Sequence, residues 1–194
     1  MAFFSIAGEG ILDLSVARVI IYHHGHQVFA EFDKRGKDRL DASLHGYFLA
    51  SRHSPWLILR DLDAAECPIT LLDNIAPNRA DFGNALLRVC IRSVESWLLA
   101  DRTGFSQHFG VSANHIPAAP DNLLNPKLSL VQCVARSRFR NLREGIVPRT
   151  GSGRSVGPEY NAILSQYIAT NWDVKRACLN SDSLNRAFER IANF

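Results

Sequence analysis

Acidic residues follow three runs of the sequence that are typical of buried β-strands. Glu9 follows the run 3–7, Asp61 and Asp63 follow the run 56–59, and Glu95 follows the run 84–92. Carboxylates that lie close together repel one another and have raised pKa values unless a cation neutralises them. Mg²⁺ prefers such hard oxygen ligands and commonly joins one or two carboxylates to a substrate phosphate. These residue types in this pattern therefore predict a site for Mg²⁺ or Mn²⁺.

Each acidic motif on its own also has a purely structural explanation. The segment Asp63-Ala64-Ala65-Glu66 fits the capping box of a following helix. Ser93 suits a helix N-cap, and Glu95 then lies in the favourable first turn. Helix caps do not require an acidic residue after each of the three strands, so the presence of acids after all three favours the metal site. Since residues two apart in extended backbone point the same way, we expect Asp61 and Asp63 to face one point.

The pattern along residues 1–112 alternates between short apolar runs and helical periodicity. Strands are expected at 3–7, 27–32, 56–59 and 84–92, with helices between them near 12–20, 40–48 and 64–75, and at 94–109. This alternation predicts an α/β fold with a parallel sheet, flanked by helices and joined by right-handed crossovers. In such a sheet the functional groups gather beyond the carboxyl ends of the strands, where the acids are.

The character of the chain changes at residue 113. Three prolines punctuate a linker, and helices are expected at 126–143, 159–169 and 184–191 around a loop at 144–157. We therefore divide the chain into an α/β core, 1–112, and a helical extension, 113–194, that packs on it.

Several of these motifs resemble Toprim domains. Glu9-Gly10-Ile11-Leu12-Asp13 is similar to their E-G-x-x-[DE] opening, Asp61-Leu62-Asp63 to their D-x-D, and Ser93-Val94-Glu95 to the S-x-E element of the OLD-type Toprim nucleases. The segment 94–101, with Asn125-Pro126-Lys127 and the closing helices, further resembles an uncharacterised Toprim-like bacterial family, often encoded beside an ATPase in phage-defence loci. The resemblance spans nearly the whole chain, although its motifs cover few positions.

The resemblance implies a Toprim-like, Rossmann-like fold and a Mg²⁺-dependent nuclease or phosphodiesterase that acts on nucleic acid. It gives Glu9 a role in metal binding or proton transfer. The other metal ligands that it implies are Asp61, Asp63 and Glu95. Asp13, one helical turn beyond Glu9, is placed to support a second ion. Lys127 is a candidate for stabilising charge in catalysis, and Asn125-Pro126-Lys127 is equally a plain helix start.

The basic charge is concentrated in the segment 134–154. This segment has six arginines and one acid, Glu144, whereas acids outnumber bases in the rest of the chain. Arginine binds phosphate through two parallel hydrogen bonds and stays charged at cellular pH, so the cluster suits a nucleic-acid backbone. The alternative is a solvated helix face followed by a basic loop. The candidate nucleic-acid-binding residues are Arg136, Arg138, Arg140, Arg143, Arg149 and Arg154.

The composition, the N-terminal residues and the cysteines indicate which broad class of protein the sequence fits. The hydrophobic fraction of 46% and charged fraction of 21% are ordinary for a globular chain, and no apolar stretch is long enough for a membrane helix. The N-terminus lacks the pattern of a signal peptide, so a cytoplasmic location is expected. The four cysteines show no C-x-x-C pair and are expected to be reduced thiols.

Two partners besides nucleic acid are candidates, a separate ATPase chain and a second copy in a homodimer. The chain has no AAA or ABC motif, so any ATP hydrolysis must come from another chain. The loop 149–155 is not a Walker A motif, because it lacks the lysine and the spacing. The alternative to a nuclease is a non-catalytic nucleic-acid-binding or regulatory module, in which the arginines bind and the acids are remnants.

Overall fold

The computed structural model describes residues 1–77 and 83–194. Their contacts divide the chain into two compact units, one of Met1–Ile91 with Arg186–Phe194 and one of Arg92–Asn185. This boundary lies before the segment 92–112, which the sequence pattern assigns to the α/β core. No helix in the described ranges has the length and apolar character needed to cross a membrane.

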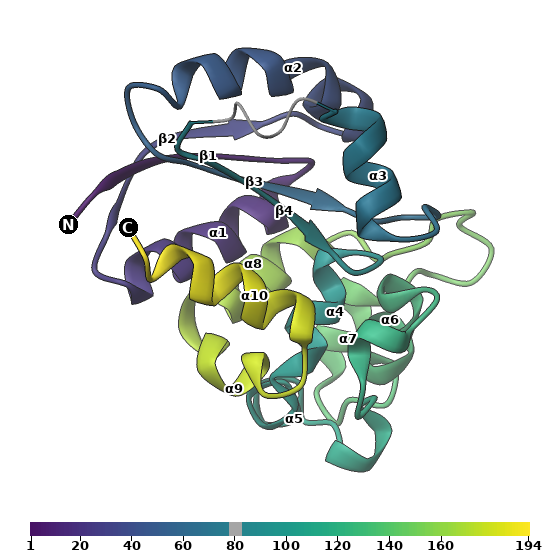
Figure 1. Cartoon of the computed structure of the whole chain (residues 1–194). Coiled ribbons are helices and arrows are strands. Elements are labelled where there is room, and N and C mark those ends of the chain that lie inside the picture. The colour runs from purple at the N-terminus through teal and green to yellow at the C-terminus, as the bar shows by residue number, and fades with distance from the viewer. Residues whose placement is uncertain (78–82) are drawn as a thin grey trace. The chain divides into compact units, whose positions relative to one another are not determined.

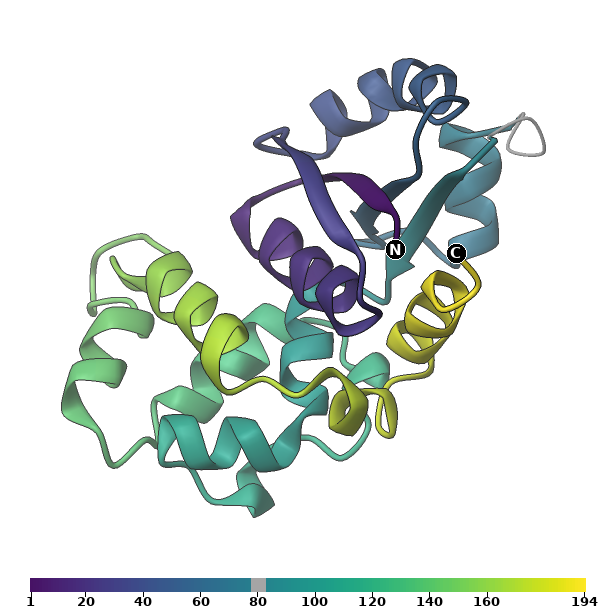
Figure 2. The ribbon, with the colours of Figure 1, turned by 90° about the vertical axis from the view of Figure 1, so that its left-hand side faces the viewer.

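The first unit is an α/β layer structure with a Rossmann-like parallel sheet. Its elements are β1 (Phe3–Gly8), α1 (Ile11–His23), β2 (Gln27–Asp33), α2 (Lys37–Ala50), β3 (Trp56–Asp61), α3 (Pro68–Ile75) and β4 (Ala85–Cys90). The strands lie in the order β2-β1-β3-β4, and every described pair is parallel. Helix α1 covers one face of the sheet, and α2 and α3 cover the other (Figures 1 and 2). The expected parallel sheet flanked by helices is therefore confirmed.

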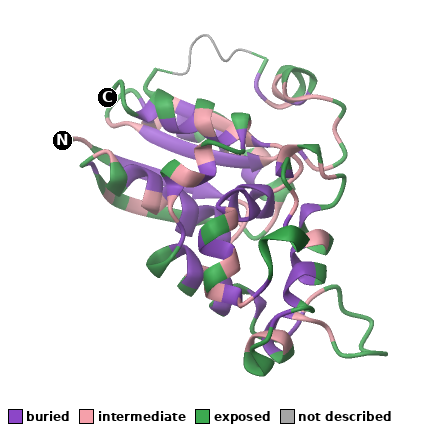
Figure 3. Ribbon diagram, turned by 90° about the horizontal axis from the view of Figure 1, so that it is seen from below, coloured by how far each residue is buried: buried purple, intermediate pink, exposed green. Residues whose placement is uncertain are grey.

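The two central strands are buried because helices cover both of their faces. Five of the six residues in β1 and in β3 are buried, whereas the edge strand β2 is mostly exposed (Figure 3). Trp56 and Ile58 pack with Leu40 and Leu44 of α2. Because side chains alternate along a strand, Arg60 lies on this α2 face, and Asp61 on the α1 face.

The loop between β3 and α3 differs from the sequence prediction. Helix α3 begins at Pro68, and the Cys67 side chain accepts a hydrogen bond from Thr70 N as the N-cap. Asp63 has a φ of +52°, in the left-handed region. The expected helix start at 64 and the capping box from Asp63 to Glu66 are therefore wrong. Pro68 is acceptable at the first helical position but favours extended backbone just before it, so the helix starts there.

The second unit is helical. Its elements are α4 (Val94–Ala100), α5 (Arg102–Phe109), the short 3₁₀ turns η2 (Ala113–His115) and η3 (Pro120–Asn122), α6 (Pro126–Val134), α7 (Arg140–Ile146), α8 (Tyr160–Thr170) and α9 (Val174–Cys178), and it contains the first residues of α10 (Asp182–Ile191). The helices expected at 94–109 and 126–143 are each divided into two. The short α9 was not predicted.

A buried carboxylate explains why the helix expected at 94–109 is divided. Asp101 has no exposed surface and is the N-cap of α5, where it accepts a hydrogen bond from Gly104 N. It also accepts hydrogen bonds from Asp173 N and from Arg176 Nε and Nη2, each 2.8–2.9 Å long. Asp101 therefore ties the start of α5 to the start of α9, which lies 72 residues further along the chain.

Substitution of Asp101 is expected to destabilise the second unit. In Asp101→Ala the N–H groups of Gly104 and Asp173 lose their acceptor, and the Arg176 guanidinium keeps only Asp173 of its two carboxylate partners. We expect a loss of about 3 kcal/mol in the free energy of unfolding, measured by urea denaturation. The control Glu144→Gln breaks an exposed ion pair with Arg140 and should leave stability unchanged. Equal stability of Asp101→Ala and wild type would contradict this assignment.

Candidate metal centre

The strand order places Glu9 and Asp61 at a topological switch point of the sheet. From β1 the chain passes through α1 to β2 on one side, and from β2 through α2 to β3 on the other side of β1. Where neighbouring strands continue in opposite directions, the loops after their carboxyl ends diverge and leave a crevice, which is where open α/β sheets bind ligands. Glu9 directly follows β1, and Asp61 is the last residue of β3.

Asp13 and Asp61 are brought together on the α1 side of the sheet. Ligand atoms of Asp13, Asp61 and Cys90 all lie within 4.8 Å of one another. Cys90 joins them because it is the register partner of Asp61 in the β3–β4 ladder. A neighbouring residue on a parallel strand points to the same face, so Cys90 lies beside Asp61. Asp13 and Cys90 are buried, and Asp61 is partly exposed.

A backbone N–H at Gly10 and the absence of a side chain at Gly8 allow Asp13 to reach this position. Its Oδ2 accepts a hydrogen bond of 2.9 Å from Gly10 N, which is the N-cap residue of α1. A Cβ atom at Gly8 would lie 2.5 Å from the Asp13 Cβ, a separation that packed atoms do not tolerate. Glycine at position 8 is therefore required for α1 to start so close to the end of β1.

A second group of carboxylates surrounds the buried guanidinium of Arg60 on the α2 side. Arg60 Nε and Nη2 donate to the two carboxylate oxygens of Asp41 at 3.0 and 3.2 Å. Its Nη1 donates to Glu9 Oε1 at 2.9 Å and to Asp63 Oδ2 at 3.2 Å. Lys37 Nζ lies 3.3 Å from the same Asp63 oxygen. Arg60 thus links the ends of β1 and β3 to helix α2.

The expectation that Asp61 and Asp63 face one point is not met. Asp61 lies with Asp13 and Cys90, whereas Asp63 contacts Arg60 and Lys37. The two-residue repeat applies only to extended backbone, and the strand ends at Asp61. The positive φ of Asp63 then turns its side chain toward the α2 face.

Glu9 connects the two groups. Its Oε1 accepts hydrogen bonds of 2.9 Å from Asp61 N and from Arg60 Nη1. Burial raises the pKa of the Glu9 carboxyl above its ordinary value, although the hydrogen bond from Asp61 N and the charge of Arg60 oppose that shift. A carboxyl group with a raised pKa takes up a proton more readily, which suits proton transfer.

Glu95 and Lys127 lie in the second unit and form a group there. The buried Glu95 accepts hydrogen bonds from Ser93 Oγ at 2.6 Å and from the Tyr160 hydroxyl at 2.9 Å. Lys127 Nζ lies 4.0 Å from Glu95 Oε1 and 5.4 Å from the centre of the Tyr160 ring. Tyr160, which the sequence analysis did not single out, therefore holds Glu95 from helix α8.

The helix starts that offer a structural explanation for Glu95 and Lys127 are also present. Ser93 is the N-cap residue of α4, although its hydroxyl bonds to Glu95 and not to the helix backbone. Asn125 Oδ1 accepts a hydrogen bond from Leu128 N and caps α6, with Pro126 at the first helical position. Lys127 is thus part of a helix start and also a neighbour of Glu95.

The candidate arginines have different surroundings. Arg140 pairs with Glu144, Arg143 donates to the Ser137 carbonyl, and Arg138 lies 4.9 Å from the centre of the Phe139 ring. Arg136 contacts the His115 ring, at 3.4 Å. Arg149 and Arg154 line one hollow of about 410 Å³ in the loop before α8. Neither of these two forms an ion pair with a residue in the described part of the chain.

Two of the three candidate ligands on the α1 side suit Mg²⁺ or Mn²⁺. Asp13 and Asp61 offer the carboxylate oxygens that Mg²⁺ and Mn²⁺ prefer, whereas the Cys90 thiol is a soft ligand that does not suit Mg²⁺. All four cysteines are free thiols, as expected, and Cys67 and Cys178 are partly exposed.

Comparison with known proteins assigns the chain to no family. The chain matches no family model, no curated protein and no solved structure.

The role of Arg60 leads to a prediction about stability and pH. In Arg60→Gln the carboxylates of Glu9, Asp41 and Asp63 lose their shared cation, which should cost about 3–5 kcal/mol at pH 7. Without the Arg60 charge, which opposes the effect of burial, the pKa of Glu9 rises further in the folded state, so the folded protein binds more protons and regains stability as the pH falls toward 5. Urea denaturation at both pH values measures this.

The control for this experiment is Arg18→Gln, which removes a partly exposed ion pair with Glu31. It should change stability little at either pH. A loss in Arg60→Gln that is equal at pH 5 and pH 7 would show that packing, and not charge, explains the effect.

Proposed function

We propose that this chain is a divalent-metal-dependent phosphodiesterase that acts on nucleic acid, a nuclease of Toprim-like type. The observation that carries the proposal is the meeting of the Asp13 and Asp61 carboxylates beside the switch point between β1 and β3, where Glu9 accepts a hydrogen bond from Asp61 N. Carboxylates at that position suit a cation that in turn binds a phosphate group.

In this proposal Asp13 and Asp61 hold the cation. When bound, Mg²⁺ or Mn²⁺ would supply a Lewis acid that neutralises charge on the phosphodiester and lowers the pKa of a bound water. Glu9 is positioned by Asp61 N and Arg60, and its raised pKa suits acceptance of the proton from the attacking water. Arg60 and Lys37 hold Asp63 at the other side of Glu9, where it contributes negative charge.

The resemblance also implies Asp63 and Glu95 as metal ligands and Lys127 as a catalytic residue. These three roles stay predictions, since Asp63 pairs with Arg60 and Lys37 and the other two residues lie in the second unit. The buried Glu95 with its tyrosine, serine and lysine neighbours is a polar group held in a fixed orientation, which supports a functional role. An ATPase partner, a homodimer and a role in phage defence also stay predictions.

Metal binding tests the proposed centre without knowledge of the substrate. Wild type is expected to bind Mn²⁺ in calorimetry, and Asp61→Asn and Asp13→Asn to lose that binding. The asparagine side chain in Asp13→Asn retains an oxygen that can accept from Gly10 N, so the start of α1 is kept. The matched control Asp38→Asn changes an exposed acid in the first turn of α2 and should bind as wild type does. Equal Mn²⁺ binding in all variants would rule out the centre.

Cleavage of plasmid DNA and of single-stranded RNA tests the activity. We expect Mn²⁺-dependent cleavage that falls about a hundredfold in Asp61→Asn and in Glu9→Gln, and that persists in Cys90→Ser if the two carboxylates suffice as ligands. Undiminished cleavage in both acid variants would contradict the proposed roles. Metal-independent binding without cleavage would favour the non-catalytic module.

Salt dependence tests the nucleic-acid contact of the arginine segment. We expect Arg149→Gln and Arg154→Gln each to lower the slope of log affinity against log salt concentration by about 1, because each removes one phosphate contact. Fluorescence anisotropy with a labelled oligonucleotide at several salt concentrations measures the slope. Arg18→Gln, which lies in the other unit and pairs with Glu31, is the control and should leave it unchanged.

A further inference from the structure

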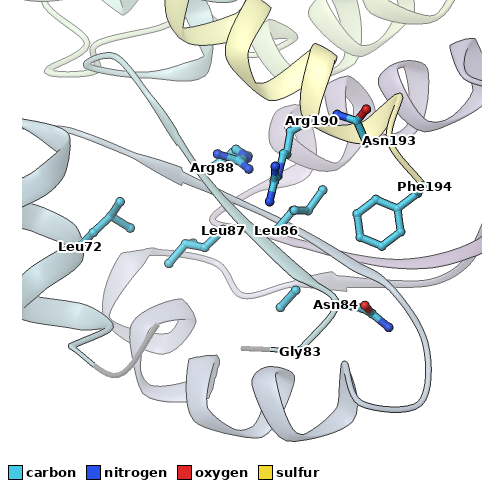
Figure 4. Close-up of a pocket in the computed structure, with 10 residues that line it drawn as sticks. Leu72, Gly83, Asn84, Leu86, Leu87, Arg88, Arg190, Asn193 and Phe194 are labelled. Atoms are coloured by element: carbon cyan, nitrogen blue, oxygen red, sulfur yellow. The ribbon is translucent and has the colours of Figure 1, made fainter. Parts of the chain in front are cut away.

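A cavity of about 850 Å³ lies beside the edge strand β4 in the first unit (Figure 4). It is bounded by the start of β4, by Leu72 of α3 and by the C-terminal residues from α10 onward. Asp61 and Cys90 lie at the carboxyl end of the strand pair, whereas the cavity follows β4 from Gly83 to Arg88. The cavity is therefore separate from the candidate metal centre, and its volume is typical of sites for small molecules.

Two arginines share this cavity, and neither has a carboxylate partner among residues 1–77 and 83–194. Arg88 of β4 and Arg190 of α10 both extend into it and lie near each other (Figure 4). Neither forms an ion pair with any residue in the described ranges. The buried Nε of Arg88 donates to no acceptor in that same part of the chain. Buried polar groups are nearly always hydrogen-bonded, so this nitrogen requires an explanation.

The electrostatics of the pair are unfavourable without a ligand. The Arg88 side chain is partly buried, and the positive charge of Arg190 near it is repulsive. An anion between the two guanidinium groups would reverse that interaction. Phosphate fits best among common anions, because each guanidinium can donate two parallel hydrogen bonds to its oxygens.

The rest of the cavity wall favours a flat organic group attached to the phosphate. Phe194 presents an aromatic ring that is 43% exposed, and Leu72 and Leu87 add apolar surface. Asn84 and Asn193 carry side-chain amides that can donate to and accept from the edge of a heterocycle. Aromatic side chains and amides are the groups by which proteins stack and hydrogen-bond nucleobases.

We propose that this cavity binds a nucleoside monophosphate or a small molecule of the same chemistry, with its phosphate between Arg88 and Arg190 and its base against Phe194. The site requires neither the metal centre nor the nuclease activity. It gives the first unit a second ligand, on residues of β4 that precede Cys90 and outside the group of Asp13, Asp61 and Cys90.

Calorimetry with the whole chain tests the site. The probes are AMP, GMP, CMP and UMP, with the four corresponding nucleosides and inorganic phosphate for comparison, in buffer without divalent metal. We expect at least one nucleotide to bind with a stoichiometry of one per chain, and its nucleoside to bind at least tenfold more weakly. Inorganic phosphate should also bind more weakly than the nucleotide, because it lacks the contact with Phe194.

Substitutions of single arginines distinguish nucleotide binding in the cavity from non-specific electrostatic attraction of the nucleotide to a basic protein. Arg190 is exposed on a helix, so Arg190→Gln should fold and should weaken nucleotide binding about tenfold or more. Arg88→Gln should do the same, with folding checked by circular dichroism. The matched control Arg39→Gln removes an exposed arginine of α2 that does not line the cavity and should leave the affinity unchanged.

Three results would overturn the proposal. They are the absence of saturable binding for all four nucleotides, equal affinity of Arg190→Gln and wild type, and equal affinity for the nucleotide and its nucleoside. The Mn²⁺ measurement on Asp61→Asn is independent of all three, so failure of this site and failure of the metal centre can be told apart.

Discussion

The buried guanidinium of Arg60 is the group on which the candidate site depends. A charged side chain with 5% exposure is stable only when opposite charges and hydrogen-bond acceptors surround it, and Asp41, Glu9 and Asp63 supply both. These partners come from α2, from the loop after β1 and from the loop after β3. One cation therefore fixes the relative positions of three chain segments that each provide an acid.

Because side chains alternate along β3, the two faces of the sheet have different electrostatic environments. On the α2 face the carboxylates are neutralised by an arginine and a lysine, whereas on the α1 face Asp13 and Asp61 lie beside a thiol. Glu9 belongs to both groups through its two hydrogen bonds. The α2 face therefore carries structural charge pairs, and the α1 face carries the two carboxylates to which the proposed function assigns the cation.

The residues of the second unit are organised by buried polar groups of their own. Asp101 joins α5 to α9, and Tyr160 holds Glu95 from α8. The periodicity of apolar residues carried no sign of either contact, because each joins positions more than 60 residues apart. For the same reason the sequence pattern predicted one continuous helix across Asp101. An aspartate in an apolar periodic run can continue a helix or cap a new one, and the distant donors Asp173 N and Arg176 hold this one as a cap.

The class of the first unit and the placement of its acids could be predicted from the amino-acid sequence alone. The apolar runs, their lengths and the helical spacing between them predicted the parallel sheet, and residues directly after strands had to lie at its carboxyl edge. Which acids meet could be learned only from the folded chain. Asp61 joins Asp13 and Cys90 through the strand register, and Asp63 turns to Arg60 through a left-handed backbone conformation. Local patterns specify secondary structure because it depends on near neighbours, whereas these pairings depend on strand order and on where each strand stops.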